Sequence, residues 1–319
     1  MRLDGKRVLV TGATGSFGST ILPELIKANV GEIVAYSRDE EKQFWLRTQY
    51  KDAPIRWVIG DVRDLQRLTE SMKDVDIVLH AAALKEINFC EDHPIEALKT
   101  NTLGAINVRS AAITNNVDVV VAISTDKAVK PVNTYGMTKA IQERIFTSSH
   151  ELLETHTKFV VVRYGNVLGS RGSVIPFFKK KIEANEPLPI TDIRMTRFLL
   201  TLGQAIELVF YSLDAFQTGI IFVRKAPSCR ITDIAHVLGG EHYPTVITGI
   251  RPGEKIHEIL VSEDELRRSE GIENYVLIYP YDVYVGESVN LKKEYSSDSQ
   301  TLLDIDGVRE LLSKNGFLK

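Results

Sequence analysis

The sequence predicts an α/β protein with a doubly wound parallel sheet and a smaller C-terminal domain. Two observations predict this fold. Short apolar runs bounded by turn residues alternate with helical patterns over the first half of the chain, as in strands joined by crossover helices. A glycine-rich segment stands between the first apolar run and the first helical pattern. Ligands bind at the carboxyl ends of the strands in such sheets, so the residues that follow each strand are the candidates for function.

The first strand is predicted at residues 8–10, and glycines follow at positions 12, 15 and 18 before a helical pattern at residues 21–26. Glycines at this spacing allow a tight turn and a close approach of backbone to ligand, and they aim a helix N-terminus at a phosphate. A turn without a ligand would also use glycine, but the strand–loop–helix context favours a dinucleotide site. The candidate residues of this loop are Gly12, Thr14, Gly15, Ser16, Phe17 and Gly18.

The second strand, predicted at residues 32–36, ends before a charged tip that bears on the choice of cofactor. An acidic residue at such a tip holds the ribose 2′-hydroxyl of NAD, whereas an arginine accommodates the 2′-phosphate of NADP. Arg38 and Lys42 compete here with Asp39, and Arg38 would reach the phosphate side first, which favours NADP. The same charges could instead only begin a helix. Ser37, Arg38 and Lys42 are therefore the candidate NADP ligands at this tip.

The third and fourth strands are predicted at residues 56–59 and 77–80. Asp61 follows the third strand, where it could accept from the adenine amino group or cap the next helix. Small residues at 81–83 follow the fourth strand and would let a ribose and pyrophosphate lie against the backbone. Lys85 comes shortly after them, where a substrate phosphate or sugar could sit. The cofactor candidates from these strand ends and from the helix predicted at residues 100–112 are Asp61, Val62, Ala81, Ala82, Lys85 and Asn101.

The fifth strand, predicted at residues 117–123, leads into the segment STDKAVKPVNTYGMTK at residues 124–139, which holds most of the reactive side chains. Tyr135 and Lys139 fall on one helical face, so their polar ends can share one site. A lysine held near a phenol favours the phenolate and would make Tyr135 a proton acceptor. A strand end followed by a turn and a solvated helix start is the alternative interpretation. The candidate catalytic residues of this segment are Thr125, Asp126, Lys127, Tyr135 and Lys139.

The pattern changes after a sixth strand, predicted at residues 159–163, because glycines and prolines then interrupt it repeatedly. We therefore expect a dinucleotide-binding domain at residues 1–166, with a segment near 198–225 returning to it, and a mainly substrate-binding domain at residues 167–319. The elements expected after the boundary are a basic helix at residues 177–182, an apolar helix at 199–212, a strand at 220–223 and an amphipathic finish at 308–312.

Composition argues against several classes of protein. The formal net charge of −3 gives no argument for binding nucleic acid or an anionic membrane surface. The contents of hydrophobic residues, 44%, and charged residues, 25%, are those of a globular protein, and no apolar run approaches a membrane span. With two cysteines and no signal region after Met1, we expect a cytoplasmic protein without disulfides. The histidines have no metal-ligand spacing, so we expect no metal.

The glycine loop and the Tyr135-x-x-x-Lys139 pair resemble those of the extended short-chain dehydrogenase/reductase family, which has a Rossmann sheet. A closer likeness rests on the segments TGATGSFGS, YSRDEEKQ, GDVRD, HAAALK, STDKAVKP, VRYGNVLGSRGSVIPFF, ITDIRMTRF and IRPGEK. These segments resemble the inverting UDP-N-acetylglucosamine 4,6-dehydratases, which begin the synthesis of bacterial nonulosonates (pseudaminic acid) or capsular sugars. The likeness covers about residues 5–260. It implies NADP as cofactor, UDP-N-acetylglucosamine as substrate and a homo-oligomer.

The resemblance also implies a role for each catalytic residue. Tyr135, helped by Lys139, would take the proton of the sugar's 4-hydroxyl while hydride leaves C4 for the nicotinamide. Neutral Lys127 would then remove the C5 proton, and protonated Asp126 would donate to the departing C6 hydroxyl. Hydride would return to C6, and reprotonation of C5 on the opposite face would give the L-sugar. This scheme needs a neutral Lys127 and a protonated Asp126, and we expect burial to shift both pKa values in those directions.

On the substrate side, the resemblance implies a set of residues around the uridine diphosphate and sugar. They are Lys85, Thr125, Tyr135, Asn166, Val174, Thr191, Arg197, Arg251 and Glu254. Retaining dehydratases carry Thr-Asp-Glu where this chain has Thr-Asp-Lys, and 4-epimerases need no acid–base pair there, so Lys127 argues against both of these alternatives. A non-catalytic NADP-binding regulator on the same fold is a third alternative, which the intact catalytic residues disfavour.

Overall fold

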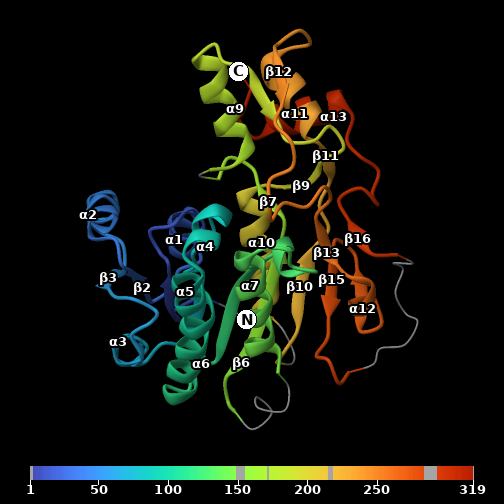
Figure 1. Ribbon diagram of the computed structural model, residues 1–319. Helices are drawn as coiled ribbons and strands as arrows, with labels where there is room; N and C mark the ends of the chain where they lie inside the picture. Colours follow the sequence, from blue (N-terminus) through green and yellow to red (C-terminus); the bar gives the residue numbers. More distant parts are fainter. Residues whose placement is uncertain (1–2, 149–154, 171, 215–217, 284–292, 319) are drawn as a thin grey trace.

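The protein is built on one large sheet, seen in the computed structural model (Figure 1). The structure describes residues 3–148, 155–170, 172–214, 218–283 and 293–318. Within these residues the sheet has nine strands, whose order is β14 (Ser269–Ile272), β15 (Tyr275–Ile278), β10 (Ile221–Arg224), β6 (Lys158–Tyr164), β5 (Val119–Thr125), β4 (Ile77–His80), β1 (Arg7–Thr11), β2 (Glu32–Ser37) and β3 (Ile55–Ile59). The strands from β10 to β3 pair in parallel, and β15 and β14 add an antiparallel edge. The predicted doubly wound parallel sheet is therefore confirmed.

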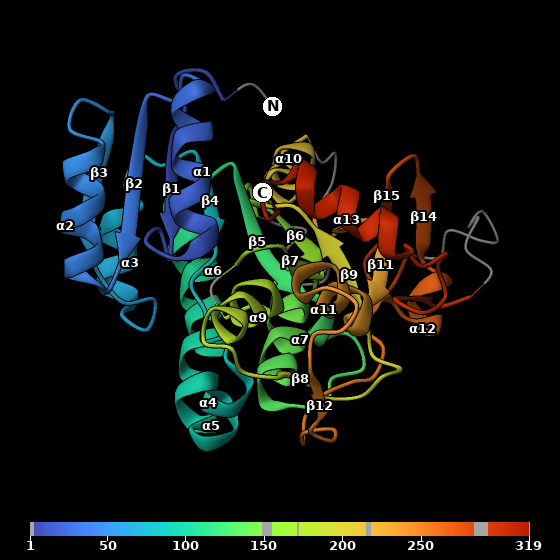
Figure 2. The same ribbon diagram turned by 90° about the horizontal axis from the view of Figure 1, so that it is seen from above.

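Helices cover both faces of this sheet. The helical segments around it are α1 (Ser16–Lys27), α2 (Glu40–Gln49), α3 (Leu65–Ser71), α4 (Ile87–Asp92), α5 (Pro94–Ala97), the π-helical η1 (Leu98–Leu103), α6 (Gly104–Thr114), the 3₁₀ turn η2 (Asp126–Ala128), α7 (Thr134–Thr147), α10 (Leu202–Ser212) and α12 (Glu263–Leu266). Figure 2 shows α1 and α10 on one face and α6 and α7 on the other. In the described part of the chain, no helix combines the length and the apolar character needed to cross a bilayer.

The register of the central strands decides which residues emerge at the carboxyl edge. Thr11 of β1 pairs with His80 of β4, and His80 pairs with Ala122 of β5. β5 continues past that level as far as Thr125, which pairs with Tyr164 of β6. The end of β5 therefore projects beyond its neighbour β4, at the edge where ligands bind in such sheets.

A smaller group of elements packs around a second hydrophobic cluster, at the top of Figure 1. Its elements are β7 (Asn166–Val167), α9 (Val174–Glu183), β8 (Leu188–Ile190), β9 (Thr196–Leu200), β11 (Ser228–Arg230), α11 (Ile231–Gly239), β12 (Thr245–Ile247) and α13 (Ile305–Lys314). The cluster includes Phe178 of α9, Ile234 of α11, and Val308 and Leu312 of α13. A further pair, β13 (Ile259–Val261) and β16 (Tyr295–Ser296), lies outside it. The domain boundary after residue 166 remains a prediction.

Two features of the second half differ from the sequence predictions. Leu199 and Leu200 belong to β9 and not to the helix expected at residues 199–212. The helix starts later because Thr201 caps it: its hydroxyl accepts from the Gln204 N–H, and the Gln204 side chain accepts from the Thr201 N–H. The antiparallel edge formed by β14 and β15 was not predicted, since short strands of mixed burial have no clear periodicity.

Arg163, near the end of β6, joins the large sheet to the C-terminal segment. Its side chain is 1% exposed and donates to Glu143 of α7 at 2.6 and 2.8 Å and to Glu265 of α12 at 2.8 and 2.9 Å. It also donates to the Leu260 carbonyl at 2.8 Å. Burial would raise the pKa of the Glu265 carboxyl, but Arg163 outweighs this effect and lowers it to about 2. This buried ion-pair cluster fixes β13 and α12 against α7.

Replacing Arg163 with alanine would leave two buried carboxylates without their common cation. We expect Arg163→Ala to lower the free energy of unfolding by about 3–5 kcal/mol, measured by urea denaturation. Arg56→Ala is the matched control, because the Arg56 guanidinium pairs with Glu32 at the surface. Loss of such an exposed ion pair should lower the free energy of unfolding by only about 0–1 kcal/mol. Equal shifts of the two variants would contradict the structural importance of the buried cluster.

Candidate active site

The loop between β1 and α1 forms a close-packed cradle at the carboxyl edge of the sheet. Gly12 has φ +69°, and a Cβ there would lie 2.9 Å from the Ala82 nitrogen. A Cβ on Gly18 would lie 2.4 Å from the Gly12 carbonyl oxygen, so no side chain fits at either position. Gly15 caps α1 without a side-chain hydrogen bond, which leaves backbone N–H groups at the helix N-terminus for an anion. With Thr14 in the loop and Ser16 and Phe17 in the first turn of α1, the cradle suits the pyrophosphate of a dinucleotide.

The loop after β4 closes the other side of this cradle. The Thr11 hydroxyl accepts from the backbone N–H groups of Ala81 and Ala82 at 3.1 and 3.2 Å. Asn101, fully buried on η1, accepts from the Leu84 N–H at 2.8 Å and donates to the Leu84 carbonyl at 2.9 Å. Asn101 therefore holds the loop in place, and π-helical turns such as η1 are frequent at functional sites. Lys85 follows this loop and is exposed.

The tip of β2 separates its charges into two groups. Asp39 caps α2 by accepting from the Lys42 N–H at 2.9 Å, and the Lys42 ammonium pairs with the same carboxylate. Arg38 is half exposed, and its guanidinium lies 3.5 Å from the Asp61 carboxylate. Burial would raise the pKa of Asp61, but hydrogen bonds from Arg63 and the charge of Arg38 lower it overall. Both cations of this tip are thus half exposed, and each is paired with an acid: Arg38 with Asp61, and Lys42 with Asp39.

Two further predicted cofactor residues at this edge are largely buried. Ser37 accepts a hydrogen bond from the Gln43 side chain at 2.9 Å. Val62 packs against Gly104 at the start of α6, where a Cβ on the glycine would meet the valine methyl at 2.7 Å.

The projecting end of β5 carries a buried acid between a hydroxyl and an ammonium. Asp126 is fully buried, and its Oδ1 accepts from the Thr125 hydroxyl at 2.8 Å and from Lys127 Nζ at 3.0 Å. Among the described residues, its Oδ2 has no hydrogen-bond partner. The Thr125 hydroxyl also acts to lower the pKa of the Tyr135 phenol. Four of the predicted catalytic side chains therefore lie together in one cluster.

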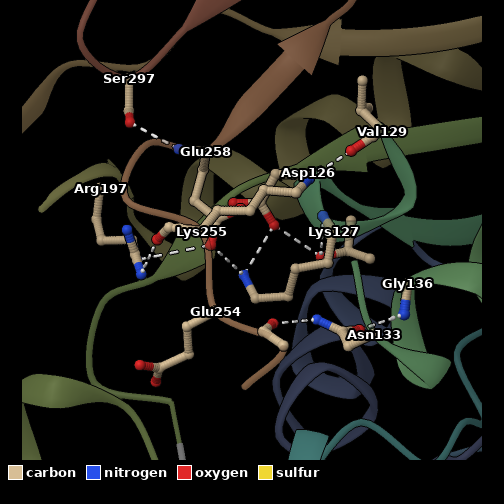
Figure 3. A network of polar contacts seen from close by, with 12 residues as sticks. Asp126, Lys127, Val129, Asn133, Gly136, Arg197, Glu254, Lys255, Glu258 and Ser297 are labelled. Atoms are coloured by element: carbon tan, nitrogen blue, oxygen red, sulfur yellow. Dashed lines mark hydrogen bonds and ion pairs between the residues drawn. The ribbon is translucent and has the colours of Figure 1, made fainter. Parts of the chain in front are cut away.

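A second carboxylate, which sequence reasoning missed, lies on the other side of Lys127. Glu258 is 3% exposed, and its Oε1 is 3.5 Å from Lys127 Nζ (Figure 3). The same oxygen lies 3.6 Å from Arg197 Nε. Glu258 follows the IRPGEK segment closely, but an acid in a loop gives no sign of burial until its partners from other segments are known. The buried site therefore contains two carboxylates around one ammonium.

The charges around Lys127 overturn one sequence expectation. Burial lowers the pKa of the Lys127 amine, but Asp126 and Glu258 outweigh burial and raise the pKa above its ordinary value. Lys127 is therefore an ammonium in the free protein. The expectation that burial makes it neutral is wrong, because two carboxylates are buried with it.

The Tyr135 and Lys139 pair also differs from the simplest expectation. Burial raises the pKa of Tyr135 to about 12, although Lys127 and the hydrogen bond with Thr125 act in the opposite direction. Lys139 Nζ donates to the Ile123 carbonyl and to Gln142 Oε1, both at 2.6 Å. Burial lowers the pKa of Lys139 to about 7, against the opposing effect of Glu143. Tyr135 is thus a neutral phenol, and Lys127 is the cation that acts most strongly on it.

Arg197 uses most of its hydrogen-bond donors to hold the backbone around the site. Its guanidinium donates to the carbonyls of Thr196 at 2.7 Å, Ile256 at 3.0 Å and Lys255 at 3.1 Å. The Lys255 ammonium in turn donates to the Val129 carbonyl, just after η2 (Figure 3). The predicted substrate residue Arg197 therefore joins β9 to the segment that carries Glu258.

The remaining predicted substrate residues come from several different elements. Arg251 and Glu254 form an ion pair at 2.8 Å in a loop that docks on the start of α7, where Asn133 donates to the Gly253 carbonyl at 2.7 Å. Asn166 lies on β7, and its Oδ1 is buried without a partner among the described residues. Val174 begins α9 and Thr191 follows β8, and both are partly exposed.

Comparisons with known proteins agree with this geometry. A family model described as "Polysaccharide biosynthesis protein" matches residues 8–280. A relative from Campylobacter jejuni, named UDP-N-acetylglucosamine 4,6-dehydratase (inverting), is 44% identical over 316 residues, covering 93% of this chain and 94% of the relative. A relative from Rickettsia bellii, named UDP-glucose 4-epimerase, is 40% identical over 324 residues, covering 96% and 95%. The X-ray structure of Pen from Bacillus thuringiensis has a TM-score of 0.92 and 34% identity, covering 98% of this chain and 100% of that chain.

Proposed function

The chain belongs to the polysaccharide biosynthesis protein family, and from that premise we propose that it is a UDP-N-acetylglucosamine 4,6-dehydratase that inverts C5. The observation that carries the proposal is the buried pair of Asp126 and Lys127, an acid and a base 3.0 Å apart in contact with Thr125 and Tyr135. Such an enzyme is a hydro-lyase that removes water across C5 and C6 of the sugar. Its product is the L-configured 4-keto-6-deoxy sugar nucleotide.

A nicotinamide dinucleotide fits the cradle at Gly12 and Gly18, where any Cβ would collide with backbone. We propose that the dinucleotide is NADP, held by Arg38 at the tip of β2 and by the N-terminus of α1. When bound, it supplies a site that accepts hydride from C4 of the sugar and returns it to C6. Lys139, one turn after Tyr135 on α7, would orient the nicotinamide ribose of the dinucleotide.

The first proton transfer uses the chain of contacts that begins at Tyr135. The neutral phenol takes the proton of the sugar's 4-hydroxyl as it passes its own proton to the Thr125 hydroxyl. Thr125 in turn donates along its 2.8 Å hydrogen bond to Asp126. A phenolate is not required, because the Asp126 carboxylate is the final acceptor. This relay leaves Asp126 protonated, which is the form it needs for the next step.

The second step uses Lys127 and Asp126 together. The 4-keto group acidifies the C5 hydrogen, and the neutral amine of Lys127 removes it as a proton. Asp126 then donates the proton it has received to the departing C6 hydroxyl, and water leaves. Reprotonation of C5 on the opposite face inverts the configuration. Each positioned acid or base is worth a rate factor of about 10²–10⁴.

An epimerase is the second candidate function, because the Rickettsia bellii relative has that name. A 4-epimerase needs only oxidation and reduction at C4, for which Tyr135 would be enough. It has no use for a buried acid and base beyond the end of β5. Asp126 and Lys127 therefore favour the dehydratase.

We also propose that the enzyme works in the cytoplasm as a homo-oligomer and supplies the synthesis of surface glycans of the nonulosonate type. Exposed apolar side chains on α4, η1 and α6, which all contact α7, and on α7 itself support self-association. They are Phe89, Leu98, Leu103, Ile106, Met137 and Ile141.

Turnover in heavy water tests the proposed function directly. We expect NMR of the first product from UDP-N-acetylglucosamine to show a 4-keto-6-deoxy sugar with deuterium at C5 and inverted configuration. Lys127→Ala should lower kcat by about 10²- to 10⁴-fold. Lys130→Gln, in the same loop but exposed, is the control and should keep the native rate. A product with the original C5 configuration, or the 4-epimer alone, would contradict the proposal.

The choice of cofactor has its own test. Arg38→Ala should weaken NADP binding by about 10- to 100-fold while leaving NAD binding unchanged, because only NADP offers a 2′-phosphate for a charge-assisted hydrogen bond. Arg47→Ala removes an exposed arginine from the last turn of α2 and is the matched control. Both affinities can be measured by calorimetry. Equal losses for NADP and NAD would overturn the assignment of Arg38.

A further inference from the structure

The proposed function leaves one proton without a destination, and the inference below rests on that function. Lys127 must be a neutral amine to remove the C5 proton, yet the structure holds it as an ammonium. Asp126, its nearest acceptor at 3.0 Å, is protonated in the first step through Thr125 and is then no longer available. A second acceptor within reach of Lys127 is therefore required.

Glu258 meets this requirement by position. Its Oε1 lies 3.5 Å from Lys127 Nζ, which also contacts Asp126 (Figure 3). It is 3% exposed, and its Oε2 has no hydrogen-bond partner within the described residues, so the carboxylate has spare capacity for a proton. Arg197 Nε lies 3.6 Å from the same Oε1, while the other two nitrogens of the guanidinium donate to backbone carbonyls.

The backbone around Glu258 is fixed on both sides by Ser297. The Ser297 hydroxyl accepts from the Glu258 N–H at 2.9 Å, and the Ser297 N–H donates to the Glu258 carbonyl at 2.7 Å. The carboxylate is thus held beside Lys127 by β13 and by the segment after β16. Because the Glu258 side chain is buried, it would not touch the substrate itself, and it acts only through Lys127.

We propose that Glu258 accepts the proton that Lys127 loses before it acts on C5. An Nζ–H bond breaks and an O–H bond forms on Glu258, which leaves the lone pair on Nζ and removes two buried charges. That lone pair then takes the C5 proton, and the electrons of the C–H bond pass to the C4 carbonyl oxygen. Lys127, 19% exposed, gives the C5 proton to water and takes its first proton back from Glu258. One proton leaves and one returns to C5 from solvent, so the cycle closes.

The charged groups that face Glu258 come from three segments. They are Asp126 and Lys127 around η2, Arg197 on β9, and Lys255 in the loop before Glu258 itself. His257 faces away, with Nδ1 hydrogen-bonded to Thr196 and Nε2 3.8 Å from Asp298. Since Arg197 stays charged at every working pH, the group whose protonation controls the rate is Lys127.

The variant Glu258→Gln distinguishes a role of Glu258 as proton acceptor from a purely structural role. Glutamine keeps the size of glutamate but cannot accept a proton from Lys127, which must then lose it to water. We expect kcat for UDP-N-acetylglucosamine to fall by about 10²- to 10⁴-fold with little change in KM. The rate of the variant should rise about tenfold for each pH unit, because the neutral fraction of an amine rises in that proportion below its pKa. Glu258→Asp keeps a carboxylate and should restore a flat profile at a reduced rate.

Glu263→Gln on α12 changes an exposed glutamate and is the control, with a native rate and pH profile expected. A Glu258→Gln enzyme within about threefold of the native rate would overturn the proposal, as would a slow enzyme whose rate does not change with pH. The native protein gives a readout without any variant: its kcat should be flat at pH values above the pKa of Lys139, which is about 7, and a tenfold rise per pH unit there would also overturn the proposal. If the native protein shows no turnover of UDP-N-acetylglucosamine, the proposed function itself has failed, which is a separate result.

Discussion

The site depends on one buried ammonium held between two carboxylates. Lys127 lies 3.0 Å from Asp126 and 3.5 Å from Glu258, and both acids are almost completely removed from water. Removing either acid would leave the other charges unbalanced at a large cost in free energy. The same balance keeps Lys127 protonated in the free protein. In the proposed mechanism, the passage of the 4-hydroxyl proton from Tyr135 to Asp126 would couple the first step of the chemistry to the second.

The fold provides the two sides of this site from distant parts of the chain. β5 projects beyond β4 and ends at Thr125, directly before Asp126, while Glu258 comes from the segment that leads into β13. Two buried arginines hold that segment in place: Arg163 pairs with α7 and α12, and Arg197 donates to the carbonyls before Glu258. In the proposed mechanism, this segment would therefore belong to the catalytic site as well as to the predicted substrate-binding domain.

Much of the fold could be predicted from sequence, because buried parallel strands leave short apolar runs and the nucleotide loop leaves spaced glycines. The contacts among Thr125, Asp126 and Lys127 could also be expected from sequence, since these residues are adjacent in the chain, while their catalytic roles stay a prediction. The charge of Lys127 was predicted wrongly, because it depends on Glu258, which no local pattern connects to it. The start of α10 was missed for a smaller reason: Leu199 and Leu200 fit a helical pattern, and the cap at Thr201 decides otherwise.

The charge of Lys127 in the free protein is the central claim, and nitrogen-15 NMR of its side chain measures it directly. The signal can be assigned by its absence in Lys127→Ala. A titration should show Nζ still protonated at about pH 10.4, the ordinary pKa of a lysine, because Asp126 and Glu258 hold the charge. An amine that loses its proton below that pH would contradict the account.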